Sequence, residues 1–143
     1  MKKLAQAFVG NSNVWAIGLM NEPHDMNKVW VYGGAAQAGV NGIREVDSNV
    51  RILVPLDQWQ GVATLDPNWD GGWFKDNIDL RITDPSNNFL IDGHLYFDTG
   101  AGRYKDGSGN YKYCMSYWGA YTTRGRDLTR PFVTWLKERG YKG

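Results

Sequence analysis

The fold of this chain is decided by residues 14–23, which read VWAIGLMNEP. An apolar run over residues 14–20 ends abruptly at Asn21, Glu22 and Pro23. Such a run, bounded by turn residues, is typical of a strand that is covered on both faces, as in a parallel sheet. The sequence therefore predicts a buried strand over residues 14–20, with Glu22 just past its carboxyl end.

The side chains of this strand alternate between two faces. One face carries Trp15, Ile17 and Leu19, and the other carries Ala16, Gly18, Met20 and Glu22. Small side chains suit the crowded interior of a barrel, whereas large ones suit the layer between strand and helix. Glu22 is therefore expected to lean inward at the end of the strand.

The residues after this turn predict a helix and then a second strand. Ala36, Val40 and Ile43 follow an i, i+4, i+7 pattern, which predicts a helix that ends near Asn49. The stretch Arg51–Pro55 then predicts a short strand. Strand, helix and strand in this order form one βαβ unit, which favours a parallel α/β architecture.

A long loop and a third strand are predicted next. Leu56–Asn88 is rich in Asp, Asn, Gly and Trp, which indicates a loop with at most a short helix around Gly72–Ile78. Phe89–Phe97 alternates as a strand does. Its polar face carries Leu90, Asp92, His94, Tyr96 and Asp98. Such a face either meets water at the surface or lines a wet cavity.

Helices are also predicted at the two ends of the chain. The helical spacing of Leu4, Ala7 and Phe8 indicates the last turns of a helix. Near the other end, a helical stripe with Gly140 as C-cap is formed by Leu128, Phe132, Trp135 and Leu136. We expect Tyr141–Gly143 to begin another strand.

Composition narrows the class of ligand. The chain has 143 residues, which suits one domain. Its formal net charge of +1 provides no strong field for nucleic acid or for a membrane surface, so we expect neither as a partner. Seven Trp and eight Tyr are many for this length, and such rings stack on the apolar faces of pyranoses. A neutral saccharide is therefore favoured, although most of these rings are expected to pack in the core.

No metal or cofactor site is predicted. Cys114 is the single cysteine, which excludes an internal disulfide and a multi-cysteine metal site. The stretch Asp106–Asn110 resembles a calcium loop but lacks the terminal bidentate Glu. No glycine-rich loop ends in Lys-Ser or Lys-Thr before a helix, which excludes a phosphate cradle of that kind. No apolar run reaches the length of a membrane span, and the basic start of the chain is a poor signal peptide.

Three segments together resemble glycoside hydrolase family 5, the cellulase family. Residues 14–26 resemble the fourth barrel strand of that family, which ends in Asn-Glu-Pro. Residues 92–98 resemble its sixth strand with a His-x-Tyr segment, and Ile52–Pro55 with Trp59 resembles its fifth strand and loop. The resemblance covers about the whole chain, as an internal piece of an endo-β-1,4-glucanase from about the third to the sixth helix. It implies a partial (half) TIM (β/α)8 barrel with parallel strands.

The resemblance implies roles for five residues. Glu22 matches the general acid/base, and the substrate-binding positions are matched by Asn21, His94, Tyr96 and Trp59. A carboxyl that protonates a glycosidic oxygen needs a raised pKa, which apolar neighbours supply by disfavouring the anion. Asn21 would hydrogen-bond the 2-hydroxyl of the sugar in the transition state. Trp59 would bind sugar or plug the barrel top, and without the resemblance Glu22 reads as a helix-entry carboxylate.

The resemblance also implies that part of the machinery is absent. The family retains configuration and uses a second Glu, at the end of the seventh strand, as nucleophile. The chain has three glutamates, Glu22, Glu45 and Glu138, and the last two lie on predicted helices. An unexpected second carboxylate would have to come from Asp57, Asp92 or Asp98. Residues 1–143 are therefore expected to form a single partial barrel domain that lacks the first three and last two strands.

Two functional classes follow from these expectations. The first is a cellulase-like hydrolase, secreted by resemblance, that acts on β-1,4-linked glucan or on a related mannan or xylan. The second is a catalytically inactive carbohydrate-binding or scaffold fragment. Because a few parallel strands cannot close an eight-stranded barrel, we expect a homo-oligomer through strand pairing or exchange, or a complementary barrel fragment as partner.

Overall fold

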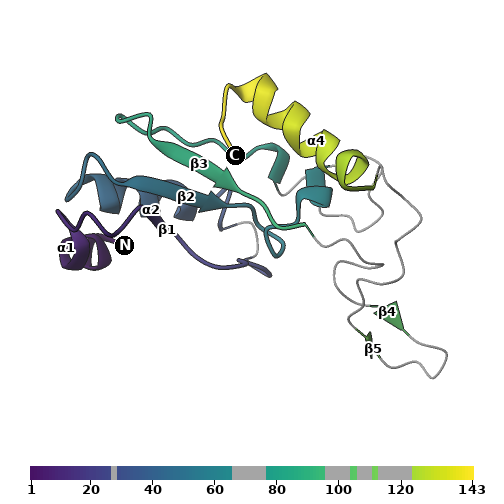
Figure 1. Ribbon diagram of the computed structural model, residues 1–143, viewed down its shortest axis with the longest axis horizontal. Helices are drawn as coiled ribbons and strands as arrows, with labels where there is room; N and C mark the ends of the chain where they lie inside the picture. Colours follow the sequence, from purple (N-terminus) through teal and green to yellow (C-terminus); the bar gives the residue numbers. More distant parts are fainter. Residues whose placement is uncertain (27–28, 66–76, 96–103, 106–110, 113–123) are drawn as a thin grey trace.

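The computed structural model describes residues 1–26, 29–65, 77–95, 104–105, 111–112 and 124–143. Its centre is a parallel sheet in the order β1-β2-β3, formed by Ala16–Gly18, Arg51–Pro55 and Phe89–Asp92. Figure 1 shows the arrows of β2 and β3 running the same way, with α4 (Arg124–Arg139) along the β3 side. The predicted βαβ unit is confirmed, since α2 (Ala35–Arg44) connects β1 and β2.

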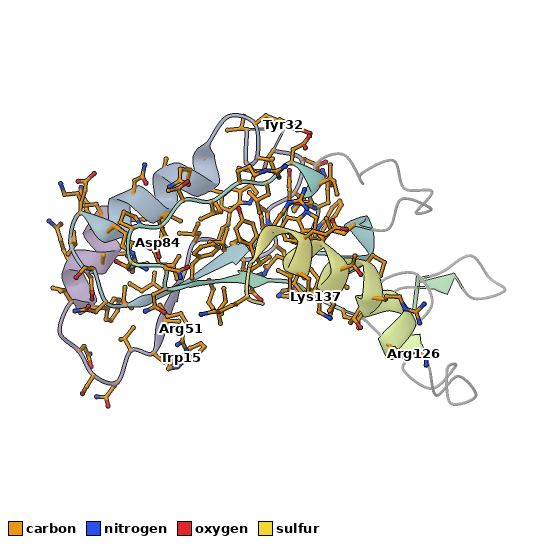
Figure 2. The ribbon with its side chains drawn as sticks, turned by 90° about the horizontal axis from the view of Figure 1, so that it is seen from above. Trp15, Tyr32, Arg51, Asp84, Arg126 and Lys137 are labelled. Atoms are coloured by element: carbon orange, nitrogen blue, oxygen red, sulfur yellow. The ribbon has the colours of Figure 1, made fainter. Side chains whose placement is uncertain are left out.

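The first strand is shorter than predicted and begins at Ala16. Ile17 is buried, as expected for the face toward the helices. Trp15 was expected on the same covered face, but its side chain is 63% exposed. The expectation was wrong because Trp15 precedes the strand, and the Arg51 guanidinium lies over its ring at 4.6 Å from the centroid. Figure 2 shows these two side chains next to each other at the margin of the molecule.

The helix α2 buries Ala36, Val40 and Ile43, as the periodicity predicted. It ends at Arg44 instead of near Asn49. The reason is a local turn, in which Oδ1 of Asp47 accepts hydrogen bonds from the backbone N–H groups of Asn49 and Val50. Asp side chains that bond nearby backbone in this way compete with the helix for its donors.

The helices at the two ends of the chain are confirmed, but the first one packs through a different face from the one predicted. The first, α1 (Lys2–Phe8), buries Ala5 and leaves Leu4 and Phe8 exposed, so the packed side differs from the one we expected. In α4, Trp135 and Leu136 are buried, and Gly140 follows with a φ of 66°, the left-handed conformation of a helix C-cap.

The third strand is also shorter than predicted, ending at Asp92. Its alternation is confirmed, because Phe89 and Ile91 are buried while Leu90 and Asp92 are half-buried. Two residues later, His94 forms an isolated parallel bridge with Gly61. Beyond β3, the N–H of Ile91 donates to the carbonyl of Lys142 at 2.7 Å. The C-terminal tail thus contacts β3, but residues 141–143 do not form the strand that we expected.

Short elements occupy the remaining described loops. A 3-10 turn, η1, spans Val62–Leu65 inside the predicted long loop. An antiparallel pair joins β4 (Tyr104–Lys105) to β5 (Tyr111–Lys112). None of the helices within the described ranges is long and apolar enough to cross a membrane.

The core lies between the sheet and its helices. It draws on every strand of the sheet, on α2 and on α4. Its most deeply buried members include Val40, Ile43, Ile52, Val54, Leu56, Leu80, Ile91 and Trp135. This packing fixes the three strand ends from which the candidate site is built.

Candidate active site

The candidate site lies where the three parallel strands end. Glu22 follows β1, Trp59 and Gln60 follow β2, and His94 follows β3. Carboxyl ends of parallel strands meet at one edge of a sheet, where loops hold functional groups over a rigid base. Residues far apart in the chain are thereby brought together.

Glu22 and His94 contact each other directly. Oε1 of Glu22 lies 2.7 Å from Nδ1 of His94, a distance typical of a charge-assisted hydrogen bond. Both side chains are partly open, at 26% and 31% exposure, so a ligand can reach them. The Glu22 backbone has a φ of 46°, a left-handed conformation that non-glycine residues rarely adopt. The two groups expected to share a cleft are therefore side by side.

The segment Gln58–Gln60 connects the turn of Glu22 to the backbone of His94. Its three residues all have left-handed backbone, with φ values of 58°, 57° and 57°. The N–H of Trp59 donates to the carbonyl of Pro23 at 3.0 Å, which attaches the segment to the turn after β1. The N–H of His94 donates to the carbonyl of Gln60 at 2.7 Å, which attaches it to the end of β3.

Gln60 is a site residue that the sequence did not point to. Its side chain is buried, and its Oε1 accepts a hydrogen bond from the N–H of Glu22 at 2.6 Å. A single glutamine in a loop carries no periodic signal, and its partner lies 38 residues earlier in the chain. Only the match of Trp59 to the family's fifth-strand loop pointed to this neighbourhood.

Trp59 is half-buried and stacks on His24. The two ring centroids are 4.6 Å apart, and the planes differ by 9°. Nδ1 of His24 also lies 2.9 Å from Oδ2 of Asp25. The sequence left open whether Trp59 binds sugar or plugs the barrel; the geometry presents a flat aromatic group beside Glu22.

Asp57 forms part of the buried base under the loop. Its N–H donates to Oδ1 of Asn77 at 2.7 Å, and Nδ2 of Asn77 donates back to its carbonyl at 2.9 Å. Its carboxylate accepts from the N–H of Gln58. With 1% exposure it cannot reach a sugar, which removes it as a second carboxylate.

The other carboxylates differ in position. Glu45 caps α2 at the opposite end of the sheet and pairs with Lys2 at 2.7 Å. Glu138 lies exposed near the end of α4, beside Arg139. Asp92 is half-buried at the end of β3, and Asp98 lies outside the described residues.

Asn21 and Tyr96 are the remaining residues that the sequence predicted for the site. Asn21 lies exposed in the turn directly before Glu22. Tyr96 lies outside the described residues. Within the part of the chain that the structure describes, no three His, Cys, Asp or Glu side chains gather as metal ligands.

The chain is similar to known proteins over its residues 1–143. The family described as cellulase (glycosyl hydrolase family 5) matches residues 1–143. Endoglucanase 1 of Saitozyma flava is 34% identical over 145 residues, covering 97% of this chain and 36% of the relative. Endoglucanase 1 of Robillarda sp. is 34% identical over 141 residues, covering 98% and 32%. The chain thus spans about a third of the length of these curated relatives.

Solved structures give the same result. The crystal structure of endoglucanase Cel5A from Pseudomonas stutzeri superposes with a TM-score of 0.73 at 30% identity, covering 99% of this chain and 39% of that one. A second structure of that enzyme, in complex with cellobiose, has the same TM-score and covers 38% of that chain. The predicted partial (half) TIM barrel with parallel strands is confirmed.

Proposed function

Because the chain belongs to glycosyl hydrolase family 5, we propose that it carries the acid/base half of a retaining β-1,4-glucanase site, with Glu22 as the proton donor. The observation that carries this proposal is the 2.7 Å contact between Glu22 and His94 at the carboxyl ends of β1 and β3. In a parallel α/β fold this edge is where catalytic groups gather. Residues 1–143 act in this proposal as one partial barrel domain.

In the first step, Glu22 gives its proton to the glycosidic oxygen as the bond from that oxygen to the anomeric carbon breaks. A carboxylate nucleophile on the opposite side forms a bond to the same carbon. In the second step, water attacks this carbon, Glu22 takes the water proton, and the nucleophile leaves. His94 orients the Glu22 carboxyl through Nδ1 in both steps.

The substrate-binding residues surround this proton donor. Asn21, exposed beside Glu22, hydrogen-bonds the 2-hydroxyl of the sugar. Trp59 stacks its indole on an apolar pyranose face. Tyr96 completes the polar lining that begins with His94. No metal or cofactor takes part in these steps.

The nucleophile is none of the three glutamates of this chain. Among the described residues, Glu45 and Glu138 lie at helix ends, and Asp57 is buried. The active form therefore uses either a carboxylate from barrel elements outside residues 1–143, supplied by a complementary barrel fragment, or a second carboxylate of this chain, Asp92 or Asp98. In the same proposal, the chain works on an extracellular polysaccharide as a secreted protein.

The substrate class is β-1,4-linked glucan. Support comes from the names of the relatives, which are endoglucanases, and from the cellobiose complex of the Pseudomonas stutzeri enzyme. Parallel assays on a soluble glucan, a mannan and a xylan test the choice. A faster rate on mannan or xylan would assign that polysaccharide as the substrate, and the proposed role of Glu22 would stay the same.

The test of the function is hydrolysis of a soluble cellulose derivative. Wild type and Glu22→Gln are compared, alone and mixed with the remaining portion of a family barrel. The variant should lose activity, because its amide cannot donate the required proton. Glu45→Gln is the matched control, since this exposed glutamate lies at the other end of the sheet. Equal rates for wild type and Glu22→Gln would remove the enzyme proposal.

A second candidate is a catalytically inactive carbohydrate-binding or self-associating scaffold. The observation that favours it is the position of β1, which within the described sheet has β2 as its one neighbour. An open strand edge pairs readily with another chain, which here gives a homo-oligomer through strand pairing or exchange. Binding of a cello-oligosaccharide without hydrolysis in any mixture would favour this candidate over the enzyme.

A further inference from the structure

We propose that Gln60 is a positioning residue, which holds the backbone of Glu22 so that its carboxyl stays against His94. This inference rests on the proposed function of Glu22. Gln60 connects the two groups by two separate hydrogen bonds, one from its side chain and one from its backbone. It is 1% exposed, so the surrounding core restricts its rotamer.

The first bond is to the acid. The N–H of Glu22 donates to Oε1 of Gln60 at 2.6 Å. Glu22 has a φ of 46°, where a non-glycine backbone is strained and persists only when neighbouring groups fix it. Since the side chain projects from this backbone, the orientation of the carboxyl depends on the bond that anchors it.

The second bond is to the partner of the acid. The carbonyl of Gln60 accepts a hydrogen bond from the N–H of His94 at 2.7 Å. The carbonyl of His94 in turn accepts one from the N–H of Val62 at 3.1 Å. These bonds continue the pairing of β2 and β3 past the ends of both strands, through the bridge of Gly61 with His94. One buried residue therefore sets the positions of both members of the Glu22–His94 pair.

The orientation of the Gln60 amide follows from its partner. Because the Glu22 N–H is a donor, the atom facing it must be the oxygen, which directs Nε2 elsewhere. Nε2 is buried and has no hydrogen-bond partner among the described residues. A buried unsatisfied donor is unfavourable for folding, so stability alone does not account for a glutamine here. In this proposal, the Gln60 side chain is there because its uncharged oxygen accepts the hydrogen bond from the Glu22 N–H.

The experiment is NMR measurement of the Glu22 backbone amide and the His94 ring resonances in wild type and in Gln60→Met. Methionine keeps the length of the side chain but removes both the acceptor and the unsatisfied donor, so the two effects on folding oppose each other. We expect the His94 ring resonances to shift, because a displaced Glu22 carboxyl no longer keeps its 2.7 Å contact with Nδ1. We also expect the Glu22 amide resonance to move upfield.

Gln37→Met is the matched control. Gln37 also accepts a backbone N–H from a distant loop, that of Thr83 at 2.8 Å, but it sits on α2. This variant should leave the Glu22 amide and the His94 ring resonances unchanged. If Gln60→Met also leaves them unchanged, or if both variants move them equally, the inference is overturned.

A measurement on wild type covers the case in which Gln60→Met does not fold. Hydrogen exchange of the Glu22 amide should be slow, as expected of a donor bonded to a buried acceptor. Exchange at the rate of an exposed turn would overturn the inference. Neither readout requires hydrolysis, so loss of the proposed function and loss of the Gln60 role give different results.

Discussion

The imidazole of His24 lies parallel to the indole of Trp59, with ring centroids 4.6 Å apart. His24 therefore covers one face of this indole, and a sugar can stack only on the other. Oδ2 of Asp25 lies 2.9 Å from Nδ1 of this imidazole. The backbone bond from Trp59 to Pro23 keeps the indole beside the turn of Glu22. In the proposed function, this supported indole is the sugar platform next to Glu22.

Removal of this platform should weaken sugar binding. Trp59→Ala is expected to reduce the affinity for cellotetraose about fivefold, because stacking on an aromatic ring contributes about 1 kcal/mol. Isothermal titration calorimetry measures the change. Trp15→Ala is the control, since Trp15 is 63% exposed at the opposite end of β1. Equal losses in the two variants would show that Trp59 has no special contact with the ligand.

The two histidines should affect different kinetic constants. His94→Ala is expected to lower kcat about 100-fold with little change in KM, because a displaced carboxyl is costly only in the transition state. His24→Ala is expected to raise KM about threefold with little change in kcat, since it loosens the Trp59 platform. Steady-state rates on a soluble glucan separate the two. A loss of kcat in both variants, with KM constant, would contradict this division.

How far the sequence predicts the site depends on whether a contact is local or distant. The strand Arg51–Pro55 is confirmed at both ends, because a short apolar run bounded by turns leaves little freedom. Glu22 and His94 were expected at one site, since the family resemblance places Glu22 at the end of one strand and His94 on another. Gln60 was missed, because its role depends on bonds to residues 22 and 94, which no local pattern encodes.

The same reasoning explains the errors in the elements. The end of α2 was misplaced because the Asp47 turn competes with helix continuation, and periodicity does not report such a turn. Trp15 was expected in a covered layer because alternation assigns faces but does not say where the strand begins. The ion pair of Arg44 with Asp84 joins residues 40 apart and also had no signal in the sequence.

That ion pair should be the largest single polar contribution to stability among those tested. Arg44 Nε lies 2.7 Å from Oδ1 of Asp84, and Nη2 lies 2.8 Å from Oδ2, with both side chains almost fully buried. Asp84→Ala leaves a buried guanidinium without its carboxylate, so we expect a loss of about 3–5 kcal/mol in the free energy of unfolding. Urea denaturation measures it. Glu45→Ala, which removes the exposed pair with Lys2, should cost less than about 1 kcal/mol.

Acid should reduce the contribution of the same pair. The hydrogen bond from Arg44 holds the pKa of Asp84 below its ordinary value of 3.8. The folded state therefore binds fewer protons than the unfolded state as pH falls. The stability that the Asp84 carboxylate contributes is complete above the unfolded pKa of 3.8, and it is lost as pH falls through the lower pKa of the folded state. We expect the gap in stability between wild type and Asp84→Asn to be constant near neutral pH and to narrow below about pH 4. A gap that widens on acidification would reverse the sign of this linkage.

The open edge of β1 should make the chain associate. The N–H of Leu19 donates to the carbonyl of Leu53 at 3.1 Å, so alternate residues of β1 direct their N–H groups away from β2. Ala16 and Gly18 are these residues, and within the described residues the sheet ends with them.

Light scattering during size-exclusion chromatography should therefore give a mass above that of one chain, rising with concentration. Ala16→Pro removes one outward donor and should shift this rise to about tenfold higher concentration, because an edge without its N–H pairs poorly. Asn13→Ala, in the exposed turn before β1, is the control and should leave the curve unchanged. A single-chain mass at every concentration for wild type would show that the β1 edge is covered, and would leave a complementary barrel fragment as the one proposed partner.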